Sequence, residues 1–167
     1  MKKNISILFS ILISANVFAS DLSLQNNIQG TGYVYRVIDG DTYEINIDNQ
    51  NVYNKLKSSS SRKEQKYLKD KYKSFRVRLA NTDTAESKHP DASRNSQEGK
   101  NASAYVKRLI EKKKVSFNCW DHGYYGRVIC SVSYNGQDVG LNLIQNGYSK
   151  YITKYGKHPY LDSQYRK

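Results

Sequence analysis

The sequence is poor in acidic residues, in cysteine and in long hydrophobic runs. Its 167 residues include 15 acidic residues against 27 lysines and arginines, so the formal net charge is +12. Only two cysteines occur, without clustered histidines, which argues against a zinc site. Hydrophobic residues make up 38% of the chain, which argues against a protein with several membrane-spanning segments. The excess positive charge instead favours a polyanionic partner, such as nucleic acid or an anionic surface.

Aromatic residues compensate for the low hydrophobic content. They make up 12% of the chain and include 15 tyrosines, whose amphipathic side chains can supply much of the buried apolar area. A chain of 167 residues is long enough for a real core but short for a second compact unit. The composition therefore predicts one folded domain and argues against a disordered chain.

The longest hydrophobic run lies at the N-terminus and has the pattern of a secretory signal peptide. Met1–Asn4 carries two lysines, Ile5–Val17 is largely apolar, and Val17-Phe18-Ala19 is a small-x-small ending. We expect residues 1–19 to be the signal peptide and residues 20–167 the mature domain. The alternative is a membrane anchor, but about 13 apolar residues are fewer than the roughly 20 that span a bilayer. We therefore expect an exported protein, periplasmic or secreted, without stable membrane insertion.

Export changes how the two cysteines are interpreted, because thiols can pair under oxidising conditions. Apolar residues alternate around Cys119 and again around Cys130, and Gly123–Gly126 between them has the composition of a turn. An antiparallel hairpin with Cys119 opposite Cys130 would place His122 opposite Arg127 around a four-residue loop. We therefore expect a disulfide, worth roughly 3 kcal/mol for a loop of about 12 residues. The alternative is a pair of buried free thiols.

Five segments with alternating apolar residues predict β-strands, at residues 33–38, 43–47, 75–79, 115–119 and 128–132. Between the first two segments, Asp39-Gly40 is a strong hairpin-turn signal. Apolar residues at helical spacing predict a helix over Ala102–Ile110. A second helix is expected from about Asp138 to Asn146, with Gly147 as its stop. This order predicts an α+β, mainly β fold: a five-stranded oligonucleotide-binding-type barrel with two or three flanking helices.

Two polar segments fall outside this pattern. Residues 20–31 are expected to be a loose lead-in to the first strand. Residues 54–73 form a basic insertion between the second and third strands, with eight lysines or arginines against two acidic residues. Within the insertion, Ser61 and Glu64 have capping-box spacing, which predicts a short polar helix over Arg62–Tyr72. The insertion is interpreted either as an arm that contacts phosphates or as a solvated loop.

Three short motifs carry residues that suit phosphodiester chemistry: Asp39-Gly40-Asp41-Thr42, the segment Arg78–Glu86, and Tyr125-Gly126-Arg127. Each motif alone is also compatible with a plain turn, a polar strand end or a solvated arginine. Together they supply what hydrolysis requires: ligands for a hard cation, a carboxylate that takes the proton of water, and cations that stabilise charge at phosphorus. Carboxylates and carbonyls suit Ca²⁺, and arginines suit phosphate.

The motifs and their order resemble the staphylococcal nuclease, or thermonuclease, family from about Tyr33 to Tyr155. The matching residues are Asp39-Gly40-Asp41-Thr42, Arg78, Asp83-Thr84-x-Glu86, Lys88-His89-Pro90, Ala102-Ser103-Ala104 and Tyr125-Gly126-Arg127. The resemblance implies a Ca²⁺-dependent endonuclease that acts on DNA and RNA. It also implies that the products carry 3′-phosphate and 5′-hydroxyl ends.

The resemblance implies a role for each carboxylate of these motifs. Asp41 and Asp83 would supply Ca²⁺-binding carboxylates, and Thr84 would supply a backbone carbonyl. Glu86 would orient or deprotonate the attacking water. These residues would form the metal-binding part of the site and its general base.

The same resemblance implies which residues hold the substrate. Arg78 and Arg127 would grip the scissile phosphate, and Tyr125 and Tyr155 would contact the nucleotide. We expect nucleic acid, as DNA and RNA, to be the substrate and the protein to be a monomer.

The chain departs from the family pattern at several places. Ala85 replaces the usual proline before Glu86, so the loop loses a φ restraint, and Gly123 stands where an aspartate is common. The basic insertion has no counterpart in the family, and Leu161–Lys167 is shorter than its C-terminal helix. An alternative function is a nucleic-acid-binding barrel that keeps the fold without catalysis. Retention of both metal carboxylates, the glutamate and both arginines favours the nuclease.

Overall fold

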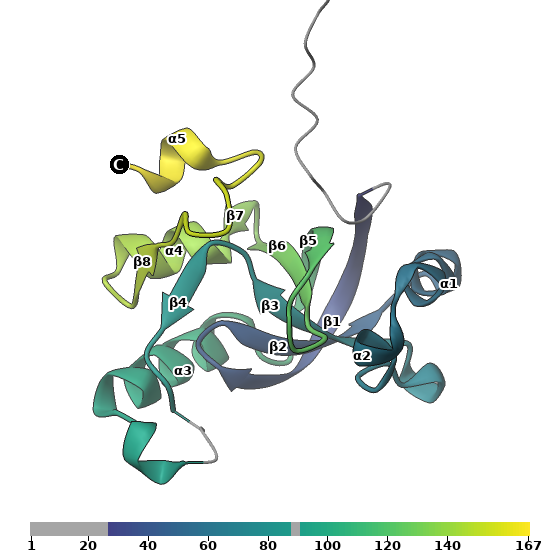
Figure 1. Ribbon diagram of the computed structural model, residues 1–167, viewed down its shortest axis with the longest axis horizontal. Helices are drawn as coiled ribbons and strands as arrows, with labels where there is room; N and C mark the ends of the chain where they lie inside the picture. The colour runs from purple at the N-terminus through teal and green to yellow at the C-terminus, as the bar shows by residue number, and fades with distance from the viewer. Residues whose placement is uncertain (1–26, 88–90) are drawn as a thin grey trace, which may run out of the picture.

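Most of the chain forms strands and helices around one apolar core (Figure 1). The computed structural model describes residues 27–87 and 91–167, so the expected signal peptide and the Lys88-His89-Pro90 motif lie outside it. The strands are β1 (Ile28–Asp39), β2 (Thr42–Ile47), β3 (Ser74–Leu79), β4 (Thr82–Thr84), β5 (Lys114–His122), β6 (Val128–Tyr134), β7 (Gln137–Asp138) and β8 (Ser149–Tyr151). The α-helices are α1 (Gln50–Ser59), α2 (Arg62–Gln65), α3 (Gln97–Ile110), α4 (Val139–Gln145) and α5 (Asp162–Tyr165). In the described part of the chain, no helix is long and apolar enough to cross a membrane.

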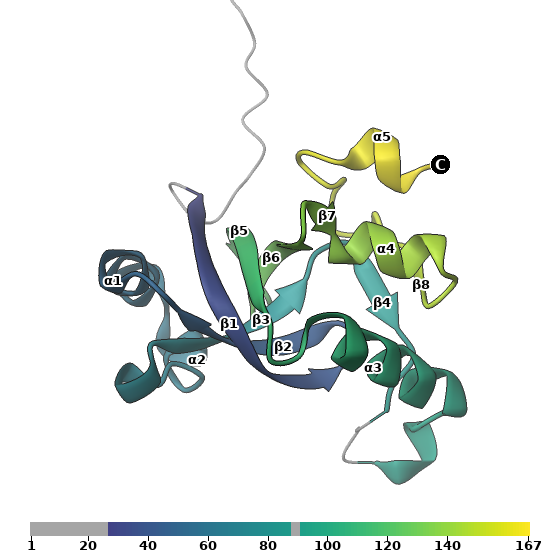
Figure 2. The same cartoon turned by 180° about the vertical axis from the view of Figure 1, so that it is seen from behind.

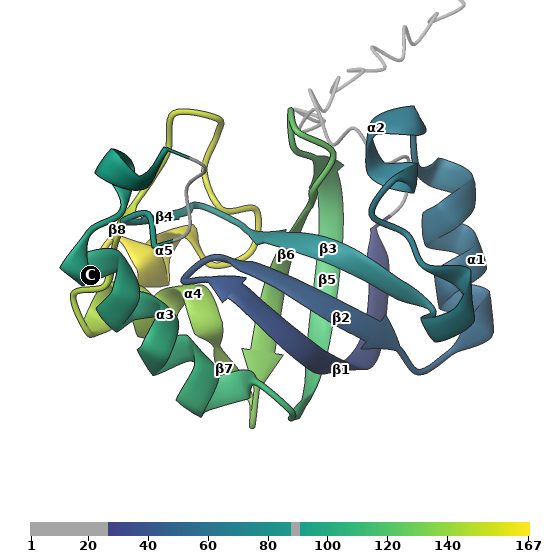
Figure 3. The same ribbon diagram turned by 90° about the horizontal axis from the view of Figure 1, so that it is seen from below.

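Five of the strands close into a barrel. Antiparallel neighbours follow in the order β3, β2, β1, β5 and β6, and β3 pairs in parallel with β6, where Val77 lies opposite Val128. β7 extends the sheet at β6, and β4 forms a separate antiparallel pair with β8 beside α4 (Figure 2). The expected five-stranded, mainly β barrel is therefore confirmed. Figure 3 shows α1 and α2 at one end of the molecule and α3, α4 and α5 at the other.

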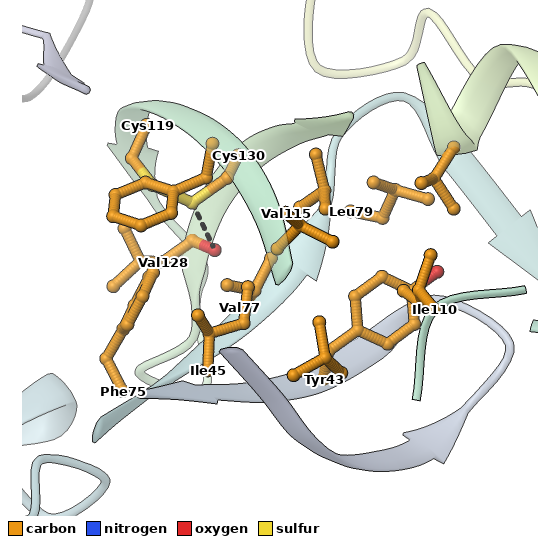
Figure 4. Packing of buried hydrophobic residues seen from close by; sticks show 14 of the residues in the cluster. Tyr43, Ile45, Phe75, Val77, Leu79, Ile110, Val115, Cys119, Val128 and Cys130 are labelled. Carbon is orange, nitrogen blue, oxygen red and sulfur yellow. Dashed lines mark hydrogen bonds between the residues drawn. A yellow bond between two sulfur atoms is a disulfide. The ribbon is translucent and has the colours of Figure 1, made fainter. Parts of the chain in front are cut away.

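Alternating strand residues fill the barrel (Figure 4). Tyr43, Phe75 and Val77 are among the side chains buried in one continuous cluster. Each large apolar side chain of this kind contributes about 1.5 to 3 kcal/mol when fully buried. Cys119 and Cys130 lie in the same cluster and form the expected disulfide, with their Cα atoms 4.0 Å apart.

The register of the β5–β6 hairpin differs from the expected one beyond the disulfide. Cys119 does lie opposite Cys130, but Asp121 is the next paired residue, so Trp120 forms a bulge. The prediction that His122 lies opposite Arg127 was wrong, because His122 pairs with Val128 instead. Trp120 is buried and packs against the ring of His158, from the C-terminal segment. Packing outside the hairpin therefore accounts for the extra residue.

The basic insertion folds differently from the expectation. The prediction of a helix over Arg62–Tyr72 was wrong, because α2 ends at Gln65. After it the chain turns back, and Lys69 pairs with Ser74. The capping box at Ser61 is present, with Glu64 accepting a hydrogen bond from the backbone N–H of Ser61. The longest helix in this region is α1, which begins before the insertion at Gln50, ends within it at Ser59 and was not predicted. Its side chains pack through Tyr53 and Leu56, one helical turn apart.

The remaining elements agree with the periodicity of the sequence, except at the start of β1. Helix α3 buries Ala102, Val106 and Ile110, and α4 starts at an Asp138 cap. The lead-in expected up to residue 31 was too long, since β1 begins at the buried Ile28 and pairs with β5. A polar sequence can pair as a strand when its neighbour supplies the hydrogen bonds.

Candidate active site

The β1–β2 turn brings Asp41 to β4. Asp39 ends β1, and its carboxylate accepts a hydrogen bond from the backbone N–H of Asp41 at 3.2 Å. Gly40 lies directly against β4, because a Cβ atom at this position would be 2.7 Å from Oγ1 of Thr84. A larger residue would push the turn and β4 apart. The glycine therefore allows Asp41 and Thr84 to contact each other.

Asp41 is a buried carboxylate held by several donors. It is 5% exposed, and its Oδ2 lies 2.6 Å from Nη1 of Arg78. The same oxygen accepts hydrogen bonds from the backbone N–H of Thr84 at 3.0 Å and from its hydroxyl at 3.2 Å. Burial raises the pKa of Asp41, although the charge of Arg78 acts in the opposite direction. The fold therefore disfavours the ionised carboxylate, a condition that a further cation would relieve.

Arg78 bridges the two aspartates of the predicted metal site. Its Nη2 donates to Oδ1 of Asp83 at 3.2 Å, while Nη1 contacts Asp41. The Asp83 side chain is 70% exposed, and pairing of β4 with β8 positions it, with Ser149 Oγ accepting from the Asp83 backbone N–H at 2.9 Å. One guanidinium therefore contacts one carboxylate from the β1–β2 turn and one from β4, which places both within reach of a single cation.

Arg127 reaches the same region from the start of β6. Its Nη1 donates to the hydroxyl of Thr42 at 3.1 Å, and that hydroxyl in turn donates to Oδ1 of Asp41 at 3.2 Å. Burial lowers the pKa of Arg127, the positive charge of Arg78 lowers it further, and nearby carboxylates, including Glu86, oppose the shift. Two guanidinium groups are therefore held close together, an arrangement that an anion between them would stabilise.

Glu86 is held through its backbone and leaves its side chain exposed. The backbone N–H of Ser96, the N-cap of α3, donates to the Glu86 carbonyl at 2.9 Å. A Cβ atom at Gly99 would overlap that same carbonyl, so the first turn of α3 packs directly against the loop. These contacts restrain the loop although Ala85 lacks the φ restraint of a proline. The Glu86 side chain is exposed, and its charge is among those that oppose the lowering of the Arg127 pKa.

The two predicted nucleotide-contacting tyrosines differ in their surroundings. Tyr125 is 65% exposed, and the Arg127 guanidinium lies 5.9 Å from its ring centroid. Tyr155 is 87% exposed and lies in a turn after β8, near Lys154. Asn81 at the β3–β4 turn donates to the neighbouring Gly156 carbonyl at 2.9 Å, which ties this turn to the edge of the site. Tyr125 thus adjoins the arginines, and Tyr155 stands apart from them.

One family model covers the part of the chain that carries most of these residues. A family model described as staphylococcal nuclease homologue matches residues 76–167, more than half of the chain. The chain belongs to this family. A search of curated proteins found no match. The part matched to the staphylococcal nuclease homologue family contains every predicted site residue except Asp41, and it excludes the basic insertion.

The donor set fits a hard cation. Two carboxylates, from Asp41 and Asp83, and the nearby Thr84 carbonyl are oxygen ligands of the kind that Ca²⁺ prefers. In the described residues, no three histidine, cysteine or acidic side chains are grouped as metal ligands. A bound cation would therefore need water or substrate oxygens to complete its shell, since Ca²⁺ takes about six to eight ligands.

Sequence reasoning did not assign a role to two features that organise this site. Thr42 connects Asp41 to Arg127, and its only sequence signal was its place in the Asp39–Thr42 motif. The first turn of α3 supports Glu86 through Ser96 and Gly99. A serine cap three residues before a glycine was a visible signal of the helix start, but it did not indicate contact with Glu86.

Proposed function

We propose that the protein is a Ca²⁺-dependent endonuclease that hydrolyses phosphodiester bonds of DNA and RNA. The products would carry 3′-phosphate and 5′-hydroxyl ends. Membership of the staphylococcal nuclease homologue family supports a nuclease. The more specific parts, namely metal dependence, substrate and type of product, are our proposal.

The observation that carries the proposal is the Arg78 bridge between Asp41 and Asp83, with Arg127 held beside it. These groups provide two carboxylates for a cation and two guanidinium groups for a phosphate. A cation between the carboxylates would release Arg78 to bind phosphate oxygens instead. A barrel that only bound nucleic acid would have no need for a buried carboxylate such as that of Asp41, whose burial raises its pKa.

In the proposed reaction, each residue has a defined task. Asp41, Asp83 and the Thr84 carbonyl would hold Ca²⁺, which when bound supplies positive charge to the phosphate. Glu86 would accept the proton of the attacking water, whose oxygen bonds to phosphorus as the bond from phosphorus to the 5′ oxygen breaks; the departing 5′ oxygen would take a proton from solvent water to become the 5′-hydroxyl. Arg78 and Arg127 would stabilise the negative charge that develops on the phosphate oxygens.

We further propose that the protein acts as an exported monomer, either periplasmic or secreted, after loss of residues 1–19. The Cys119–Cys130 disulfide supports an oxidising compartment. The tyrosines at positions 125 and 155 would contact the nucleotide, Tyr125 from beside Arg127 and Tyr155 from the outer edge of the site.

Ca²⁺ dependence is the first test. Plasmid DNA and RNA should be cleaved with Ca²⁺ and remain intact with a chelator, and the 5′-hydroxyl products should accept phosphate from a polynucleotide kinase without prior dephosphorylation. Ca²⁺ should also raise the thermal midpoint, because a ligand at 100 times its Kd stabilises the folded state by about 2.7 kcal/mol. Asp41→Ala should abolish both effects.

The control is Asp48→Ala, which removes an exposed carboxylate at the other end of β2. It should leave cleavage and the Ca²⁺-induced shift unchanged. Cleavage by the Asp41→Ala protein in excess chelator would refute the metal assignment. A protein that binds nucleic acid but cuts neither DNA nor RNA with Ca²⁺ present would instead be the non-catalytic barrel.

A further inference from the structure

The basic insertion packs against the β5–β6 turn, which carries Tyr124 and Tyr125. A Cβ atom at Gly126 would overlap the carbonyl oxygen of Lys63, and Gly126 has a φ of +81°, so this contact requires glycine. The Lys63 ammonium also lies 4.7 Å from the ring centroid of Tyr124. Figures 1 and 3 both show α2 beside the β5–β6 turn, with α1 farther away. The insertion is therefore fixed next to Arg127.

Around helix α2, the one acidic residue is buried and the basic residues are exposed. Glu64 is buried, where it accepts hydrogen bonds from Ser61 and lies 3.8 Å from Nδ1 of His122. Arg62, Lys63 and Lys66 are exposed. The only negative charge of α2 is therefore turned inward, and its outer side presents positive charge.

At the other end of the insertion, two of the lysines lie beside carboxylates. Lys57 pairs with Asp70 at 2.8 Å, and Lys69 lies 3.7 Å from Glu44. On the α2 side, Lys63 and Lys66 instead lie over the rings of Tyr124 and Tyr67. Positive charge that contacts aromatic rings, rather than carboxylates, remains available to attract phosphate.

We propose that this side of the insertion is a binding surface for single-stranded nucleic acid. The α2–turn surface consists of Arg62, Lys63, Lys66 and Tyr124. It continues the substrate path away from the scissile phosphate at Arg127, and so it rests on the proposed nucleic-acid substrate. Phosphates lie against the three basic side chains, and an unpaired base stacks on Tyr124.

The exposed tyrosines favour a single strand over a duplex. Tyr124 is 78% exposed and meets Tyr125 at an interplanar angle of 89°, so the two rings offer faces in different directions. A base can stack on such a ring only when it is not paired within a helix, and stacking of this kind tolerates any base sequence. Basic residues beside exposed aromatic rings are the combination that binds single strands in other proteins.

The salt dependence of binding tests the charges. The probe is a fluorescein-labelled oligothymidylate, and its affinity is measured by anisotropy at several salt concentrations in chelator. Lys63→Gln/Lys66→Gln should reduce the slope of log affinity against log salt by about 1.4, because each contacted phosphate of a single strand contributes about 0.7. The matched control, Lys57→Gln/Lys69→Gln, removes the same charge from two lysines that lie beside carboxylates and should leave the slope nearly unchanged. Equal slopes for the two double variants would overturn the proposal.

A substitution of Tyr124 tests whether a base stacks on this ring. Tyr124→Ala should weaken oligothymidylate binding roughly five- to 100-fold, the range expected for loss of one stacked base. Tyr124→Phe should retain the affinity, since the ring face remains. Duplex binding should change less than threefold in both variants. An equal loss for duplex and single strand would mean that Tyr124 supports the fold of the turn, and it would reject stacking.

Failure of this proposal can be distinguished from failure of the proposed nuclease activity. If the protein cleaves nucleic acid with Ca²⁺ but the two double variants bind alike, the α2–turn surface is wrong and the activity stands. If the slopes differ as expected but no cleavage occurs, the surface stands and the activity is wrong.

Discussion

The candidate active site and the cluster of Asp138 and Tyr165 both bury polar side chains, but the neighbours of these side chains differ between the two. In the site, burial raises the pKa of Asp41 and lowers that of Arg127, so the fold disfavours both charged forms. In the other cluster, the carboxylate of Asp138, which caps α4, accepts hydrogen bonds from the Leu141 backbone N–H at 2.8 Å and from the Tyr165 hydroxyl. Neutral donors therefore satisfy this second carboxylate within the fold itself.

This difference indicates which of the two clusters binds an ion or a substrate. Buried charges with unfavourable pKa shifts gain stability when an opposite charge arrives, and such shifts are enriched at functional sites. A carboxylate that caps a helix and receives a hydroxyl already has its partners, and it has a structural role. We therefore assign binding and chemistry to the cluster around Asp41, and stabilisation of the barrel to the cluster around Asp138.

The β5–β6 hairpin connects the two clusters. Trp120 on β5 packs against His158 of the C-terminal segment, with ring centroids 5.1 Å apart. Arg127, which directly precedes β6, belongs to the candidate active site, and the Cys119–Cys130 disulfide joins the two strands. Four substitutions or conditions test whether the clusters are separate in function, from the largest expected effect to the smallest.

Glu86→Gln should have the largest effect, and only on chemistry. Loss of a general base typically lowers turnover by roughly 10² to 10⁴, or about 3 to 5 kcal/mol in the barrier. Oligonucleotide affinity and the free energy of unfolding should change little, because the side chain is exposed. Single-turnover cleavage and chemical denaturation of the same protein measure both quantities. Full activity in this variant would remove Glu86 from the mechanism.

Removal of the disulfide should have the next largest effect, on stability. Cys119→Ala/Cys130→Ala is expected to lower the free energy of unfolding by roughly 2 to 3 kcal/mol. The pairing of β6 with β3 and with β5 does not depend on the disulfide, so single-turnover cleavage at low temperature should be nearly unchanged. Denaturant titration of this variant beside the oxidised protein measures the loss. A variant with normal stability but no activity would show that the hairpin couples the two clusters.

Tyr165→Phe should destabilise the protein by about 1 to 2 kcal/mol without affecting cleavage. It removes the hydroxyl that donates to Asp138, and a buried acceptor that loses a partner carries a desolvation cost. Tyr160→Phe is the control, because that ring is half exposed. A loss of turnover in the Tyr165→Phe protein would contradict a purely structural role for this cluster.

The pH dependence of stability should show the smallest effect. Nδ1 of His158 accepts hydrogen bonds from the backbone N–H groups of Tyr160 and Leu161, and burial lowers the pKa of this imidazole. The unfolded state therefore takes up the proton first as pH falls. Stability should be fully present above about pH 6.5 and decline below it, by at most about 1.4 kcal/mol for each pH unit, since one proton is involved.

Denaturation between pH 8 and pH 5 measures this slope. His158→Asn keeps an acceptor and should flatten the profile, and His122→Asn should leave the decline in place. An unchanged decline in the His158→Asn protein would assign the effect to another group.

Local patterns determined much of this protein. Alternation of apolar residues predicted the five barrel strands, and their spacing around two cysteines predicted the disulfide. The order of short motifs predicted which carboxylates and arginines would gather, and the structure brings Asp41, Arg78, Asp83 and Arg127 into one cluster. These features were accessible because side-chain periodicity and turn chemistry act over a few residues.

Only the tertiary structure decided the features that join distant segments. The Trp120 bulge follows from packing against His158, and the docking of α2 follows from contact between Lys63 and Gly126. Such contacts join residues more than 35 positions apart, and no periodic pattern records them. Likewise, the sequence motifs identified Asp41 and Asp83 as candidate metal ligands, but only closure of the barrel places the Arg78 guanidinium between their carboxylates. The physical reason is that the free energy of packing depends on which surfaces contact each other. A sequence pattern indicates which surfaces are apolar or charged, but not which of them meet.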